Sequence, residues 1–142
     1  MATAVLPFRL GDTWLAFDAH QVLEVVGAVG WLPIPGAPSR APGVVHWQGK
    51  AIALVDLGAC VLGQSALAGA SPQRLIVVRS ARCALAVPAQ QVREVQAVGE
   101  YRLQPLVASA LPFTAGEVQV DGRTLPLVDV EALVGALLGA AP

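Results

Sequence analysis

The sequence predicts a mainly β fold made of two copies of one unit, fused into a single domain over residues 1–142. Two observations predict this class: an internal repeat, and a series of short apolar runs separated by turn residues. Composition agrees, because 55% of the residues are hydrophobic and 13% are charged, which is enough apolar material for a core and too little charge for a disordered chain.

The repeat emerges when residues 9–25 are aligned with residues 79–95, and residues 43–61 with residues 116–134. Identical residues fill eight of 17 positions in the first alignment and eight of 19 in the second. By chance, a chain of this composition would match itself at roughly a tenth of positions. We therefore place repeat 1 at residues 5–66 and repeat 2 at residues 72–140, both approximately.

Each repeat is predicted to open with a hairpin. In repeat 1, residues 5–10 and 14–17 form strands joined at Gly11-Asp12; in repeat 2, residues 75–79 and 83–87 do the same around a polar turn. Asp18 and Pro88 are expected to end the second strand of each hairpin. One helical turn is then expected at residues 19–23 and 89–93, followed by a strand at residues 24–26 and 94–98.

A second hairpin follows in each repeat. Residues 43–47 and 50–55 flank Gln48-Gly49, and residues 116–120 and 123–128 flank Asp121-Gly122. The glycines are expected to supply the positive φ that such tight turns need. Asp56 and Asp129 then precede apolar residues at helical spacing, so each is predicted to cap a closing helix.

About five short strands per repeat would close most easily into a small barrel, which hides its edges. Barrels of roughly 60 residues are marginal alone, so the two should pack on each other, and their seam is a natural place for a partner. The sequence leaves open whether each repeat forms its own barrel or whether strands are exchanged between the repeats.

Several function classes find no support in the sequence. No run of about 20 strongly apolar residues predicts a membrane span, and no signal peptide is evident, so a cytoplasmic location is expected. The net charge is −1 without a basic cluster, which disfavours nucleic acid. No metal, cofactor or nucleophile motif appears, so no cofactor and no catalysis are predicted, and Cys60 and Cys83 are expected to be buried thiols.

Three side chains keep alternatives open. His20 is expected to be a solvated residue rather than a base. His46 and Trp47 lie in the central hairpin of repeat 1, where Trp47 is either a core residue on a strand or a binding hot spot.

The string WLPIPGAPSRAPGVVHWQGKAIALVDL at residues 31–57 resembles the CheW family of chemotaxis coupling proteins. The opening FRLGDTWLAFDAHQVLEV, the Asp121-Gly122-Arg123 turn and the Leu127-Val128-Asp129 helix start extend the resemblance over nearly the whole chain. The resemblance implies a fold of two five-stranded SH3-like β-barrels related by internal duplication, with short helices.

The resemblance also implies a non-enzymatic cytoplasmic scaffold that couples chemoreceptors to a CheA-type histidine kinase. Its implied partners are the kinase's regulatory domain and the signalling tips of methyl-accepting chemoreceptors, in receptor arrays at the membrane or cell pole. The receptor-side residues it implies are Val22, Gly43, Gln48 and Gly49, and the position of His46 and Trp47 in the same hairpin adds these two as candidate receptor-side residues. Glu24 is the implied kinase-side residue.

Two departures from the family pattern suggest a divergent member. The family's Asn-Leu-Arg stands here as His46-Trp47-Gln48, which replaces a charged forked donor with a neutral amide. The family's proline in the next strand is Ala53, although Pro126 keeps it in repeat 2. Two alternatives follow: a CheW-like module that localises or competes with other proteins without activating kinase, and a small-ligand sensor or enzyme that uses the seam and His46.

Overall fold

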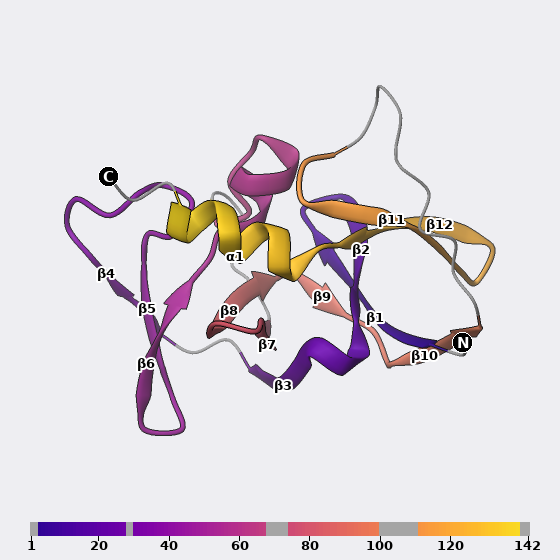
Figure 1. The fold of residues 1–142 in the computed structure, drawn as a ribbon, viewed down its shortest axis with the longest axis horizontal. Coiled ribbons are helices and arrows are strands. Elements are labelled where there is room, and N and C mark those ends of the chain that lie inside the picture. The colour runs from indigo at the N-terminus through magenta and orange to yellow at the C-terminus, as the bar shows by residue number, and fades with distance from the viewer. Residues whose placement is uncertain (1–2, 28–29, 68–73, 100–110, 140–142) are drawn as a thin grey trace.

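The computed structural model describes residues 3–27, 30–67, 74–99 and 111–139, which form two mixed β-sheets with few helices (Figure 1). The first sheet has the order β10-β1-β2-β12-β11, with β9 also paired to β1. Its strands are β1 (Thr3–Leu10), β2 (Thr13–Asp18), β9 (Gln91–Val92), β10 (Gln96–Gly99), β11 (Thr114–Val120) and β12 (Arg123–Val128). Since β10 also contacts β11, this sheet curls on itself, and we name it barrel A.

The second sheet, barrel B, has the order β3-β7-β8-β6-β5-β4. Its strands are β3 (Val22–Gly27), β4 (Leu32–Pro33), β5 (Gly43–Trp47), β6 (Lys50–Leu54), β7 (Arg74–Arg79) and β8 (Ala84–Ala89). The helical elements are η1 (Ala19–Gln21), η2 (Gly58–Leu62) and α1 (Val130–Gly139). In Figure 1, α1 lies across the middle of the molecule, between barrel B on the left and barrel A on the right. No helix of the described residues is long and apolar enough to cross a membrane.

The two repeats exchange strands, which answers the question that the sequence left open. Barrel A joins the first hairpin of repeat 1 to the second hairpin of repeat 2 through the parallel pair β2–β12, at Ala16 and Leu127. Barrel B joins the remaining two hairpins through the parallel pair β6–β8, where Leu54 faces Ala86. Each barrel therefore needs both repeats, although the bounds of the single domain and its repeats stay predictions.

The pairing registers of the two barrels agree at the offsets of the sequence repeat. Phe8 pairs with Leu15 in barrel A, and Val78 pairs with Leu85 in barrel B, 70 residues later. Likewise, β5–β6 pairs Gly43 with Leu54, and β11–β12 pairs the residues 73 positions further on. Equivalent positions in the two barrels can therefore be compared residue by residue.

Three groups of buried side chains hold the fold together. The largest lies between the barrels and under α1, where the rings of Phe8 and Phe17 stack with centroids 4.5 Å apart. Each barrel has its own smaller core, with Leu127 in barrel A and its equivalent Leu54 in barrel B. Because the large shared core takes residues from both barrels, we expect the molecule to fold as one unit.

The hairpins and turns follow the sequence predictions closely. Gln48 and Gly49 have φ of 48° and 76°, and Asp121 and Gly122 have φ of 50° and 76°. Positive φ at both central residues is the type I′ geometry that suits the twist of a hairpin. As predicted, Asp129 caps α1, since its Oδ1 accepts a hydrogen bond from the Ala132 amide at 3.0 Å.

The segment around Pro88 corrects two predictions. β8 continues through Pro88 to Ala89. Since β6 pairs only with Leu85 and Ala86, it does not require the hydrogen bond that a backbone amide at position 88 would donate, and a proline is tolerated there. The helical turn expected at residues 19–23 is present as η1, but residues 89–93 form none. Asp18 accepts a bond from the His20 amide and so caps η1, whereas Pro88, its equivalent, has no side-chain acceptor.

The helix predicted after Asp56 is present as the five-residue η2, which ends at its left-handed C-cap Gly63. One further expectation is corrected. Of the two cysteines expected to be buried, Cys60 is buried, while Cys83 is exposed because it lies in the β7–β8 turn. Both thiols are free.

Candidate functional site

The β5–β6 hairpin carries most of the predicted site residues. Gln48 and Gly49 form its exposed tip, and Trp47 is half-buried just before them. A glutamine at positive φ is uncommon, because only Gly, Asn and Asp adopt that region readily. The backbone therefore holds Gln48 in a costly conformation at the tip, a pattern often found where a side chain has a function.

The structure brings Glu24 and Trp47 together. The indole Nε1 of Trp47 donates a hydrogen bond to Oε2 of Glu24 at 3.3 Å, across β3 and the β5–β6 hairpin. The family resemblance suggests an arginine at position 48 as a partner for this carboxylate; here the indole bonds it instead. The reading of Trp47 as a core residue is confirmed in part, since its ring packs against the barrel B core while its polar edge reaches an exposed carboxylate; its reading as a binding hot spot stays a prediction.

A depression beside this pair, which we name groove B, has a volume of about 740 Å³. It lies between β6 and the β7–β8 turn. Its lining consists of Leu23, Trp47, Gln48, residues 50–53 and residues 79–84. Three of these side chains are cationic and exposed, namely Lys50, Arg79 and Arg82, and no carboxylate of the described residues lines the groove.

Two predicted site residues have a packing role. Gly43 is buried, and a Cβ at this position would collide with the Leu32 carbonyl oxygen and the Trp31 ring. Val22 is half-buried and packs against the shared core. Neither residue lines groove B, so substitution there would disturb the fold of barrel B before it reached a partner.

The positions of the two histidines do not support the hypothesis of a small-ligand sensor or enzyme that uses His46. His46 is exposed on β5, opposite Ala51, and makes no hydrogen bond or ion pair with any described residue. An acid–base site needs a partner that orients the imidazole. His20 is exposed and its Nδ1 lies 3.1 Å from Oδ1 of Asp18, which fits the expected solvated role.

The equivalent face of barrel A is occupied by its own side chains. Arg93 lies over the Trp14 ring, with its Cζ 5.5 Å from the ring centroid, and its Nη1 is 3.7 Å from Oδ2 of Asp121. These three residues are the repeat equivalents of Leu23, Ala84 and Gln48, which line groove B. The part of this face next to Trp14 is therefore bridged on barrel A, whereas the equivalents of groove B residues 79–83, residues 9–13, line a separate depression.

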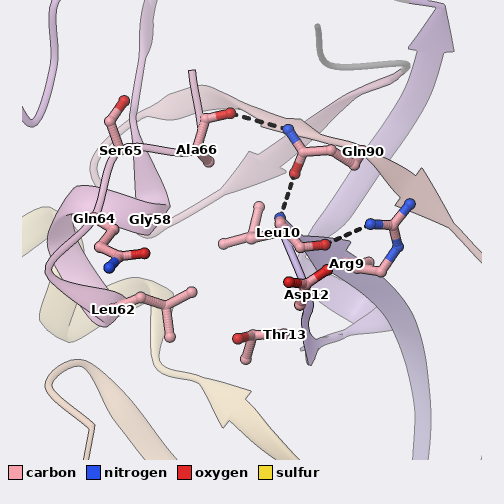
Figure 2. Close-up of a pocket in the computed structure, with 11 residues that line it drawn as sticks. Arg9, Leu10, Asp12, Thr13, Gly58, Leu62, Gln64, Ser65, Ala66 and Gln90 are labelled. Atoms are coloured by element: carbon pink, nitrogen blue, oxygen red, sulfur yellow. Dashed lines mark hydrogen bonds between the residues drawn. The ribbon is translucent and has the colours of Figure 1, made fainter. Parts of the chain in front are cut away.

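A second depression lies at the seam of the barrels (Figure 2). Its lining joins the β1–β2 turn to η2 and the loop after it. Gln90 ties the two sides together, since its Oε1 accepts from the Gly11 amide at 2.7 Å and its Nε2 donates to the Ala66 carbonyl at 2.9 Å. None of the predicted site residues lines it.

Sequence reasoning missed the cationic side of groove B and the bridging role of Gln90. Arg79 and Arg82 are far from Trp47 in the chain, and only the parallel β6–β8 pairing brings the segments together. A usable signal was present, because Arg82 stands where repeat 1 has Asp12 and Leu23 stands where repeat 2 has Arg93.

Metal chemistry has no candidate centre within the described ranges, where no three His, Cys, Asp or Glu side chains gather. Burial raises the pKa of the Cys60 thiol to about 11, so this side chain stays protonated and unreactive at neutral pH. Groove B and the Glu24–Trp47 pair offer apolar, cationic and hydrogen-bonding contacts, which suit recognition of another macromolecule.

Known proteins resemble this chain over nearly its full length. The family model described as CheW-like domain matches residues 4–137. The chemotaxis protein CheW of Rhizobium meliloti (strain 1021) is 26% identical over 133 residues, covering 91% of this chain and 85% of that protein. The probable chemotaxis protein CheW of Rhizobium etli (strain ATCC 51251 / DSM 11541 / JCM 21823 / NBRC 15573 / CFN 42) matches to the same extent.

A solved structure shares the fold. The crystal structure of scaffolding protein TtCheW from Thermoanaerobacter tengcongensis superposes with a TM-score of 0.80 and 24% identity, covering 94% of this chain and 88% of that one. The arrangement of two mixed sheets described above is therefore shared with that scaffolding protein.

Proposed function

We propose that this chain, which belongs to the CheW-like domain family, is a non-enzymatic adaptor that couples chemoreceptors to a CheA-type histidine kinase. The match of the family model over residues 4–137 carries the proposal. The names of the two rhizobial relatives point to chemotaxis, and TtCheW is described as a scaffolding protein. Identities of 24–26% suit a divergent member.

The surface we assign to partners is centred on the Glu24–Trp47 pair and the tip of the β5–β6 hairpin. Trp47 and Gln48 line an open groove, Gly49 follows them at the hairpin tip, and tryptophan is enriched at the hot spots of protein interfaces. His46 belongs to the same exposed hairpin. Val22 and Gly43 support it from within, and the division into a receptor side and a kinase side remains part of the proposal.

Binding assays test the adaptor role directly. The full chain is immobilised and challenged with the regulatory domain of each CheA-type kinase and the signalling tip of each chemoreceptor encoded in the same genome. We expect one kinase and at least one receptor tip to be retained, with a cytoplasmic location in cells. Retention of neither class would contradict the proposal.

The second candidate is a CheW-like module that binds partners without activating kinase, and Gln48 favours it. An arginine at this tip could form a charged pair with Glu24, while here the Trp47 indole takes that carboxylate. If Gln48 is the reason that the chain does not activate kinase, then Gln48→Arg should raise kinase stimulation in a reconstituted assay with kinase and receptor tip. Unchanged stimulation would reject this candidate.

A further inference from the structure

Groove B is lined by three cationic side chains that form no ion pair among the described residues, namely Lys50, Arg79 and Arg82. Two carboxylates lie at the edges of the groove, since Glu24 accepts from the Trp47 indole and Glu131 accepts from the Ala81 amide at 2.8 Å, and neither forms an ion pair with the three cations. A chain with a net charge of −1 therefore concentrates three of its nine Lys and Arg side chains at one depression.

The floor of groove B is apolar on the β3 side. Leu23 lies where the β3–β7 register shifts between Val22 and Glu24, so its side chain leaves the sheet and is 41% exposed. The half-buried Trp47 lines the same depression. An exposed leucine beside an indole ring can take one apolar side chain of a partner.

The β7–β8 turn makes a firm wall for the groove. The buried Ser80 accepts hydrogen bonds at its Oγ from the amides of Arg82 at 3.0 Å and Cys83 at 3.1 Å. The Ala81 amide is tied to Glu131 on α1. Since the turn is held before a partner arrives, little ordering is needed on binding.

The equivalent positions of barrel A carry both signs of charge, with three cations (Arg9, Arg93 and Arg123) and two carboxylates (Asp12 and Asp121). Arg93 pairs with Asp121, and Asp12 stands at the equivalent of Arg82. Barrel A therefore presents both signs of charge at these positions, whereas the described lining of groove B contains cations and no carboxylate, with Glu24 and Glu131 at its edges. This contrast between two equivalent surfaces indicates that the charge of groove B is directed at something outside the chain.

We propose that groove B binds an acidic segment of a partner protein, with one apolar side chain against Leu23 and Trp47 and carboxylates against Lys50, Arg79 and Arg82. Complementary charge fixes the register of such a segment and speeds its association. This inference rests on the proposed adaptor function and deepens it, because it names the chemistry of the partner segment and limits docking to one of two equivalent barrels.

Two synthetic 12-residue peptides test the proposal, with the same leucine and phenylalanine positions and either glutamate or lysine at all others. Binding to the ¹⁵N-labelled full chain is followed by NMR through the indole signals of Trp47 and Trp14. The glutamate peptide should shift the Trp47 signal in a saturable way and leave the Trp14 signal unchanged. Its affinity should fall as salt rises, because exposed charge pairs are screened.

Charge-neutralising variants locate the contact. Lys50→Gln combined with Arg79→Gln should weaken the glutamate peptide roughly fivefold to tenfold. The matched control is Arg123→Gln, which neutralises the barrel A equivalent of Lys50 and should leave affinity within about twofold. Unchanged backbone spectra away from the substituted positions show that each variant keeps its fold.

Three results would overturn the inference: equal binding of the lysine peptide, equal shifts at Trp14, or an unchanged affinity in the double variant. A Trp47 shift that depends on the protein's own concentration, without peptide, would also overturn it by assigning the groove to a second copy of the chain. Peptide binding without retention of any kinase or receptor domain would reject the adaptor function alone, so the two proposals fail separately.

Discussion

Barrels A and B share strand order, register and core positions, yet their equivalent outer faces differ. On barrel A, Arg93 bridges Trp14 and Asp121. On barrel B the equivalents are Leu23, Ala84 and Gln48, and the face stays open as groove B. A few side-chain differences on a duplicated backbone thus leave one face bridged and the equivalent face open, and we propose that the open face binds a partner.

The largest expected effects come from equivalent core substitutions that test whether either barrel can unfold without the other. Leu54→Ala and Leu127→Ala remove equivalent buried leucines, and each should lower the free energy of unfolding by about 2–5 kcal/mol. Because the barrels exchange strands and share the central core, both variants should still unfold in one transition. Urea denaturation followed by circular dichroism and tryptophan fluorescence checks this, and separate transitions for the two signals would refute it.

The next-largest expected difference is in the stability lost when each of the two capping aspartates, Asp56 and Asp129, is replaced by alanine. Asp56 is 2% exposed, and its Oδ1 accepts from the amides of Ala59 and Ala66, while its Oδ2 accepts from the Ser65 hydroxyl. Asp56→Ala leaves the buried Ala66 amide and the part-buried Ala59 amide without their acceptor and should cost about 2–4 kcal/mol. Asp129→Ala removes an accessible cap and should cost about 1 kcal/mol. Equal losses in denaturant titrations would show that the first closing loop is not held by its carboxylate.

The smallest effect concerns the two hairpin tips. Gln48→Asn should raise the free energy of unfolding by about 0.5–1 kcal/mol, because asparagine tolerates positive φ better than glutamine. Asp121→Asn, the matched change on barrel A, should alter stability by less than about 0.5 kcal/mol, since aspartate already suits the turn. If Gln48 is kept for a partner, the stabilised variant should also bind the kinase or receptor tip more weakly. A loss of stability in Gln48→Asn would contradict the strain argument.

Local patterns made much of the fold predictable. The Gln48-Gly49 and Asp121-Gly122 turns, the register around them and the cap at Asp129 all follow from neighbours in the chain. The exchange of strands between the repeats could not be predicted from the sequence. Pairing β6 with β8, where Leu54 faces Ala86, buries the same pattern of apolar residues as pairing β6 with a strand of its own repeat would. The prediction that Pro88 ends its strand was wrong, because a proline is tolerated in β8 only where β6 has stopped pairing, and the local sequence does not show where that is.

The candidate site was predictable only where it lies on one hairpin. Trp47, Gln48 and Gly49 stand out in the sequence, and Glu24 was expected near them, although not as the acceptor of the indole hydrogen bond. Arg79 and Arg82 join them only through long-range pairing. Gly43 was predicted to be a contact residue. In the structure a glycine is needed there because the Trp31 ring and the Leu32 carbonyl approach too closely to leave room for a Cβ.

The chain contains a natural probe for the central claim that a partner docks on barrel B and not on the equivalent face of barrel A. Cys83 is exposed and lines groove B, while Cys60 is buried with its pKa raised to about 11, so a maleimide at pH 7 should label Cys83 alone. The equivalent of Cys83 on barrel A is Thr13, which makes Thr13→Cys combined with Cys83→Ser the matched control.

The most direct measurement is the labelling rate of each thiol with and without a saturating amount of the kinase regulatory domain or receptor tip that the chain retains. The account predicts that the partner slows labelling of Cys83 at least tenfold, on the order expected for a site buried on binding, and changes labelling in the Thr13→Cys control by less than about twofold. Equal protection of both thiols, or protection of the barrel A thiol alone, would contradict it.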